Sequence, residues 1–170
     1  MILAIDPGNT HSGIALIEPG TCRPVRVAKM PNAEVLELIR TTGYHHLSIE
    51  MIASYGMAVG KEVFDTCVWI GRFIQRHEED REAWSADRCA LVYRREVKLH
   101  HCHSAKAKDA NITQALIDRF AYGQPNRGKG TKAQPGWFYG FAADIWQAYA
   151  LAVHTNDTRE TGPTHTLTNN

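Results

Sequence analysis

The chain has 170 residues, which suits one domain with a hydrophobic core of its own. Its formal net charge of +1 and pI of about 7.8 exclude a strongly basic or strongly acidic protein, so the overall charge favours no class of partner. Between residues 94 and 132, however, only Glu96, Asp109 and Asp118 oppose a series of cations: Arg94, Arg95, Lys98, Lys106, Lys108, Arg119, Arg127, Lys129 and Lys132. Such a segment fits either a surface for a polyanion or a solvated face.

The four cysteines form no Cys-x-x-Cys pair, and no apolar stretch approaches the roughly 18 residues of a membrane span. We therefore expect reduced thiols in a cytoplasmic protein that has no signal peptide and no contact with a membrane. The run His100-His101-Cys102-His103 holds zinc-binding residue types, but successive residues of a strand point to opposite faces. Because no second pair of ligands stands out, the sequence argues against a zinc site.

The first predicted elements are strands. An apolar run that ends in Asp6, a Pro-Gly turn and a second apolar run from Gly13 indicate a β-hairpin. The pattern then predicts a strand at 25–30, a helix over 32–42 and a strand at 45–51. In the last of these strands, Glu50 points to the face opposite Leu47 and Ile49.

The second half of the chain alternates helices, strands and loops. The predicted elements are a glycine-containing loop at 53–60, an amphipathic helix at 61–79, a strand at 90–102, a helix at 109–120, a loop rich in Gly, Pro and Lys at 123–136, and a last helix at 139–154. The polar segment from Thr155 to the end is expected to be disordered. This order predicts one α/β domain over residues 1–154 with a mixed sheet, followed by a tail over 155–170.

Asp6 is the most specific chemical feature in the chain, because a buried strand gains nothing by ending in an acid. An unpaired buried carboxylate is costly, so such an acid usually has a partner, often a cation. Actin-like phosphotransferases place a turn of this kind against a nucleotide phosphate, whereas RNase H-like nucleases use the acid to hold Mg²⁺. The first alternative needs a second Asp-x-Gly-x-Thr loop in a duplicated domain; the sequence has no such loop and is too short for two such domains.

Four segments together carry a resemblance to a known family. They are Asp6 at the end of the first strand, Glu50 in Leu47-Ser-Ile-Glu-Met51, the lysine-bearing segment Ser104-Ala-Lys-Ala-Lys-Asp-Ala110, and Asp144 on the last helix. In this order they resemble the RuvC-type Holliday junction resolvases of the RNase H-like superfamily, over residues 1–154. The chain is most similar to short members encoded by bacteriophages, which carry a loop like Gly128-Lys-Gly-Thr-Lys132 before a Tyr-Gly pair and a final helix.

The resemblance implies an RNase H-like fold with a mixed central sheet flanked by helices. It implies an endonuclease that cleaves four-way junctions in branched DNA with Mg²⁺, for which Mn²⁺ substitutes, in the host cytoplasm if a phage encodes it. Asp6, Glu50 and Asp144 would hold the metal, and Lys108 would lie beside the scissile phosphate, with Lys106 an equal candidate from spacing alone. Tyr55 would insert at the junction centre, and the remaining DNA-binding candidates are Lys98, Lys129 and Lys132.

The acids also make chemical sense without the resemblance. Hard Mg²⁺ prefers carboxylate oxygens, and two such ions about 4 Å apart can activate water and neutralise a leaving oxygen. One departure stands against this, because the family usually places a second acid or a histidine three residues after the first acid of the last helix. Here that fourth position is Gln147, whose amide is a poorer ligand. A non-catalytic or weakly catalytic protein that binds branched DNA therefore remains an alternative.

We also predict a homodimer, because two symmetric cuts need two sites related by a twofold axis. The helix at 61–79 is apolar around more than half of its circumference, through Val63, Phe64, Cys67, Val68, Trp69, Ile70, Phe73 and Ile74. One side can face the sheet and the other a partner subunit, with Trp69 as the expected anchor of the interface.

Overall fold

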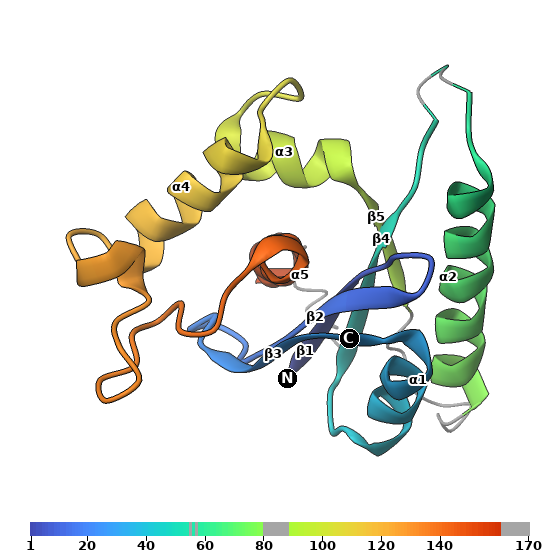
Figure 1. Ribbon diagram of the computed structural model, residues 1–170, viewed down its shortest axis with the longest axis horizontal. Coiled ribbons are helices and arrows are strands. Elements are labelled where there is room, and N and C mark those ends of the chain that lie inside the picture. Colours follow the sequence, from blue (N-terminus) through green and yellow to red (C-terminus); the bar gives the residue numbers. More distant parts are fainter. Residues whose placement is uncertain (55, 57, 80–88, 161–170) are drawn as a thin grey trace, which may run out of the picture.

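The computed structural model describes residues 1–54, 56, 58–79 and 89–160. Its centre is a five-stranded sheet with the strand order β3-β2-β1-β4-β5 (Figure 1). The strands are β1 (Ile2–Asp6), β2 (His11–Ile17), β3 (Pro24–Pro31), β4 (His46–Met51) and β5 (Ala90–Tyr93). The first three pair antiparallel, whereas β4 pairs parallel with β1 and with β5. The sheet is therefore mixed, as the sequence predicts.

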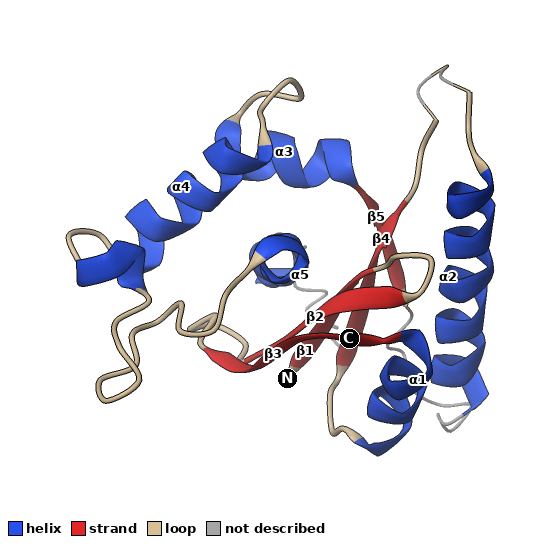
Figure 2. Ribbon diagram, in the orientation of Figure 1, coloured by secondary structure: helices blue, strands red, loops and turns tan. Residues whose placement is uncertain are grey.

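Helices cover both faces of the sheet (Figure 2). One face carries α1 (Asn32–Thr41) and α2 (Lys61–Glu79); the other carries α5 (Ala143–Glu160), which lies between the sheet and the pair formed by α3 (Arg94–Cys102) and α4 (Asp109–Phe120). A short 3₁₀ helix, η1 (Pro125–Gly128), lies in the loop before α5. Within the described part of the chain, no helix is long and apolar enough to cross a membrane.

The side chains of β1 alternate between two cores. Ile2 and Ala4 pack on the α5 side, and Leu3 and Ile5 pack on the side of α1 and α2. Because both faces are covered, the strand is a continuous apolar run rather than an alternating one. Asp6, which follows in the same alternation as Ile2 and Ala4, faces α5.

Two predicted helices, 61–79 and 109–120, have the bounds that the sequence pattern gives. The strand predicted at 90–102 is wrong beyond its fourth residue, since β5 ends at Tyr93 and α3 begins at Arg94. The Glu96 side chain accepts a hydrogen bond from the Tyr93 backbone N–H at 3.0 Å and so caps the new helix. Val97 is the one residue of α3 that is fully buried, so the segment had no clear period to distinguish strand from helix.

The last helix also differs from its prediction: it begins at Ala143 rather than 139 and continues to Glu160 rather than 154. The polar Thr155 and Asn156 are buried in it. Thr155 shares a hydrogen bond of 2.7 Å with the Ser48 hydroxyl of β4, and the Asn156 side chain accepts one of 2.8 Å from the Gly20 backbone N–H. The expected boundary of the tail at 155 therefore falls inside α5, and residues 161–170 of the predicted tail lie outside the described residues.

Candidate active site

Asp6, Glu50 and Asp144 gather at one end of the sheet, on the face that α5 covers. In the parallel pair β1–β4, Ile5 is opposite Ile49, so Asp6 and Glu50 stand side by side one residue later. Glu50 lies on the same face as Ser48, which contacts α5. Asp144 belongs to the first turn of α5, directly above this edge.

The position of Asp144 is fixed by Gly13, which pairs with Asp6 across the antiparallel hairpin. A Cβ at Gly13 would lie 2.6 Å from the Asp144 backbone oxygen, so only glycine lets α5 approach so closely. Ala143, one residue before Asp144, has a φ of +28°, a strained value for a residue with a side chain. The close contact at Gly13 places Asp144 beside Asp6, and the strained backbone of Ala143 is accepted to reach that position.

The loop after Asp6 is held by a buried polar triad that the sequence did not single out. The Ser12 hydroxyl donates a hydrogen bond of 2.7 Å to the Asn32 side chain and accepts one of 3.3 Å from the Gly8 N–H. The Asn32 amide in turn donates a bond of 2.9 Å to the Gly8 carbonyl. Ser12 and Asn32 are both fully buried. Buried polar groups that satisfy one another in this way make the loop rigid next to the acid.

Asp6 is the most perturbed carboxyl of the group. Burial, reinforced by the neighbouring Glu50, raises the pKa of Asp6 from 3.8 to about 8, against an opposing effect of Arg94; Asp144 and Asp109 raise it further. Burial also raises the pKa of Glu50 above its ordinary value, against the lowering effect of Arg94. Two adjacent buried carboxyls that resist ionisation are a favourable place for a cation.

Two basic side chains already bind acids of this site. The Lys29 ammonium lies 2.5 Å from Asp144, and the Arg94 guanidinium lies 3.0 Å from Glu50 and 2.7 Å from Asp109. Among the described residues, no three His, Cys, Asp or Glu side chains converge closely enough to hold a metal ion. The structure therefore brings the three predicted acids to one edge without forming a closed set of ligands.

The donor atoms nevertheless suit Mg²⁺, which prefers hard oxygen ligands. The predicted fourth position adds one such atom, because the side-chain oxygen of Gln147, one turn after Asp144, is buried and has no hydrogen-bond partner. An unpaired buried carbonyl oxygen is rare and suits a role as a ligand. Asp6, Glu50, Asp144 and Gln147 are thus the residues that could hold the ion.

Sequence reasoning missed Asp109 and Arg94 as members of this site. Asp109 is the first residue of α4 and Arg94 the first of α3, so both lie far from Glu50 in sequence. The residue two positions before Arg94, Val92, pairs with Glu50 in the sheet. If the end of β5 had been predicted at Tyr93, Arg94 would have been placed beside Glu50. No local sequence pattern indicates that Asp109 belongs to the site.

The predicted DNA-binding lysines lie on three different segments. Lys98 is on α3 and close enough to Glu50 to lower the pKa of that carboxyl. Lys108 is exposed at the N-cap of α4, directly before Asp109, while Lys106 lines a separate hollow between α3 and α4. Lys129 and Lys132 lie in the loop between α4 and α5, and the predicted Tyr55 falls outside the described residues.

The loop that carries these two lysines is tied to the core by a tight double turn. The Gly136 N–H donates a hydrogen bond of 3.0 Å to the Lys129 carbonyl, and the Thr131 N–H donates one of 3.0 Å to the Gln134 carbonyl. The end of this loop that leads into α5 packs through Phe138, which is fully buried among the aromatic side chains of α5. The predicted loop thus contains a small hairpin, closed by the bridge between Gly130 and Pro135, and Lys129 and Lys132 lie on it.

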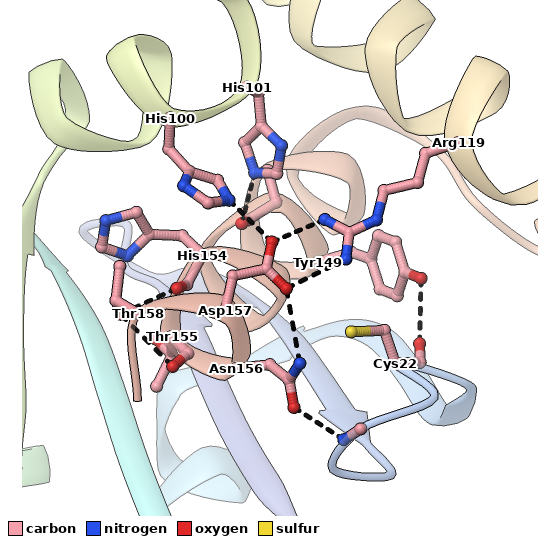
Figure 3. A network of polar contacts seen from close by, with 12 residues as sticks. Cys22, His100, His101, Arg119, Tyr149, His154, Thr155, Asn156, Asp157 and Thr158 are labelled. Carbon is pink, nitrogen blue, oxygen red and sulfur yellow. Dashed lines mark hydrogen bonds and ion pairs between the residues drawn. The ribbon is translucent and has the colours of Figure 1, made fainter. Parts of the chain in front are cut away.

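A second polar cluster fixes α3 and α4 against α5 (Figure 3). The Asp157 carboxylate of α5 accepts hydrogen bonds from Arg119 of α4, at 2.5 and 2.9 Å, and lies 2.8 Å from His100 of α3. Arg119 and His100, with a smaller effect of Asn156, hold the pKa of Asp157 down at about 2 against the effect of burial. This hub fixes the two helices whose first residues are Arg94 and Asp109.

The same cluster accounts for the histidine-rich run that contains zinc-binding residue types. The run lies on helix α3 and its cap, not on a strand as predicted. The His101 imidazole donates a hydrogen bond of 2.9 Å to the Ala150 carbonyl, and burial lowers the pKa of His101 to about 4. His100 and His101 thus both contact α5, through Asp157 and the Ala150 carbonyl.

The arrangement of strands and helices matches solved structures. Thermus thermophilus RuvC superposes with a TM-score of 0.64 and 13% sequence identity, over 94% of this chain and 95% of that one. The T. thermophilus RuvC in complex with a Holliday junction substrate gives a TM-score of 0.64 and 15% identity, over 94% of each chain. The chain has an RNase H-like fold. No protein-family model and no curated protein matches the sequence, so the likeness to RuvC lies in the arrangement of the chain in space.

Proposed function

We propose that the protein is a divalent-metal-dependent endonuclease that binds branched DNA and cleaves phosphodiester bonds at four-way junctions. The observation that carries the proposal is the meeting of Asp6, Glu50 and Asp144 at one edge of a RuvC-like sheet. A solved neighbour with this fold is in complex with a Holliday junction substrate. The acids come from two strands and a helix.

Each residue has a role that its position allows. Bound Mg²⁺ or Mn²⁺ would supply Lewis acidity and a water nucleophile. Asp6, Glu50 and Asp144 would hold the ion, and the loop after Asp6, tied by Ser12 and Asn32, would keep its carboxylate in place. Lys108 stabilises charge on the phosphate; its position next to Asp109 favours it over Lys106.

Basic residues around the acids supply the contact with DNA. Arg94, Arg95 and Lys98 line a hollow of about 370 Å³ beside Glu50. The hairpin with Lys129 and Lys132 binds a second stretch of backbone. Tyr55, four residues after the end of β4 in the sequence, would stack on a base at the junction centre, as aromatic side chains do with unpaired bases.

The direct test is a cleavage assay on three labelled substrates of shared sequence: a four-way junction, a flap and a linear duplex. We expect cleavage of the junction with Mg²⁺ or Mn²⁺, and none with EDTA or Ca²⁺. Asp6→Asn should still bind the junction but cut it below a few per cent of the wild-type rate. Robust cleavage in EDTA, or equal cleavage of the linear duplex, would contradict the proposal.

A second candidate function is binding of branched DNA without cleavage. Gln147 in place of an acid, and the lack of three converging ligand side chains among the described residues, favour it. This candidate predicts tight junction binding with no cut product at any Mg²⁺ concentration. Gln147→Asp separates the two candidate functions further. If the protein cleaves junctions slowly, the added carboxylate should raise the initial rate of cleavage or the apparent Mg²⁺ affinity.

We also propose that the protein is a homodimer, which pairs two active sites for symmetric cuts. The large apolar residues that α2 leaves exposed are Phe64, 60% exposed, and Val68, 56% exposed and one turn later. Trp69, the expected anchor, packs instead within its own subunit, against Phe73 and beneath the Arg72 guanidinium. Their exposure favours Phe64 and Val68 over Trp69 as anchors of the proposed interface.

A further inference from the structure

Arg94 joins two acids that no local sequence pattern connects. One terminal nitrogen of its guanidinium lies 3.0 Å from the Glu50 carboxylate on β4, and the other lies 2.7 Å from the Asp109 carboxylate on α4. Only 19% of the Arg94 side chain is exposed. A guanidinium is planar and keeps its charge at every pH relevant to a protein. The site thus contains a permanent cation between two carboxylates.

Lys29 makes the other ion pair of the site, but its situation differs. Its side chain is 52% exposed and it contacts one acid, Asp144, whose own side chain is 37% exposed. An exposed ion pair of this kind contributes little and exchanges easily with solvent. A metal ion can therefore displace Lys29 from Asp144, whereas Arg94 is held by two carboxylates in a largely buried position.

The balance of charge in the site also distinguishes Arg94, which stays, from Lys29, which a metal ion can displace. When ionised, Asp6, Glu50, Asp109 and Asp144 carry four negative charges. With Lys29 released to solvent, Arg94 and the nearby Lys98 supply two positive charges, and one divalent ion supplies the rest. A second divalent ion between Glu50 and Asp109 would have to remove Arg94 from the place it occupies.

Arg94 is also open to the substrate side of the site. It lines the hollow of about 370 Å³ together with Arg95 and Lys98, on the surface next to Glu50. A phosphate in that hollow would lie among Arg94, Arg95 and Lys98, while the two terminal nitrogens of Arg94 stay on the acids. Guanidinium groups suit such contacts because their donors lie in a fixed fork.

We propose that Arg94 serves as the second cation of this site, so that each chain binds one divalent ion, at Asp6, Glu50 and Asp144, rather than two. In this site Asp109 supplies the carboxylate that position 147 lacks. The cation that Asp109 binds is the Arg94 guanidinium and not a second metal ion. This inference rests on the proposed function, because it assumes that the acids bind a metal. It assigns to Arg94 and Asp109 roles that the sequence resemblance does not include.

The test counts bound ions, not turnover. Mn²⁺ is titrated into the metal-free full chain, and free Mn²⁺ is measured by electron paramagnetic resonance, with Asp6→Asn to identify ions bound at this site. We expect one such ion for wild type and two for Arg94→Gln, which frees Glu50 and Asp109. Arg94→Lys keeps the charge and should bind one. Arg95→Gln, an exposed neighbour with the same loss of charge, is the matched control and should also bind one.

The double variant Arg94→Gln with Asp109→Asn tests the second half of the inference, and it should bind one ion again. Two ions in the wild type, no gain in Arg94→Gln, or two ions retained in the double variant would each overturn the inference. The wild-type count decides even if Arg94→Gln does not fold. A wild type that binds one ion but cuts no junction would refute the proposed function alone; one that cuts junctions with two bound ions would refute this inference alone.

Discussion

The raised pKa of Asp6 predicts a variant that is more stable than the wild type but inactive. The folded chain holds the proton of Asp6 up to about pH 8, whereas an unfolded aspartate loses it near 3.8. Because the folded state binds the proton more tightly, this group makes the wild type less stable as pH rises from about 4 to about 8. Asp6→Asn removes the titration and so removes that loss.

The size of the effect follows from the two pKa values. At about 1.4 kcal/mol per pH unit between 3.8 and about 8, the ionised carboxylate costs the folded chain at most roughly 6 kcal/mol. We expect Asp6→Asn to gain at least about 2 kcal/mol at pH 8 and almost nothing at pH 4, where both side chains are neutral in the folded state. Such a gain in stability with loss of function is typical of residues selected for chemistry.

The assay is urea unfolding in EDTA at pH 4 and pH 8. Asp144→Asn is the matched control: its acid is partly exposed and paired with an exposed lysine, so its loss should change stability by less than about 1 kcal/mol. Adding Mg²⁺ at pH 8 should then stabilise the wild type and not Asp6→Asn. Equal stability of wild type and Asp6→Asn at pH 8, or a gain of the same size at pH 4, would refute the reasoning.

Three further outcomes are expected. Asp157→Asn should lower the free energy of unfolding at pH 7 by about 1–3 kcal/mol, because it weakens the polar cluster between α3, α4 and α5. Since the pKa of Asp157 is lowered to about 2, the difference between variant and wild type should vanish as pH falls from about 4 to 2. Urea unfolding at pH 7 and at pH 2 measures both values. Replacing Lys129 and Lys132 with alanine should weaken junction binding and flatten its dependence on log salt by up to about two units in a filter-binding titration, and an unchanged slope would assign the hairpin another task. Phe64→Glu should convert a dimer into a folded monomer by light scattering, and a wild type that is already monomeric while making paired cuts would defeat the dimer proposal.

Local sequence patterns were sufficient where an element has one strong period and clear ends. The helices at 61–79 and 109–120 have the predicted bounds, because an apolar stripe runs through each. Asp6 could be identified as unusual from its position after four apolar residues alone. The opposite orientation of Glu50 and its apolar neighbours also followed from the strand period.

The patterns failed where contacts distant in sequence decide the structure. The segment after Tyr93 forms a helix because Glu96 caps it and α4 and α5 pack on it, although it has one buried apolar residue. The last helix extends past His154 because Thr155 finds a partner in Ser48 of a strand more than a hundred residues earlier. Polar residues that look like a tail are stable in a helix when other elements satisfy them.

The sequence by itself therefore determined the class of fold and the order of most elements, and it marked three candidate acids, since these depend on residue type and local period. Only the tertiary structure decided which side chains bind those acids. Lys29 reaches Asp144 because β3 pairs with β2 beside Gly13, and Arg94 reaches Glu50 and Asp109 because β5 ends next to β4 and α4 returns to the same edge. A charge acts on whatever lies within a few ångströms, whatever its place in the sequence, so the electrostatics of this site could not be predicted from spacing alone.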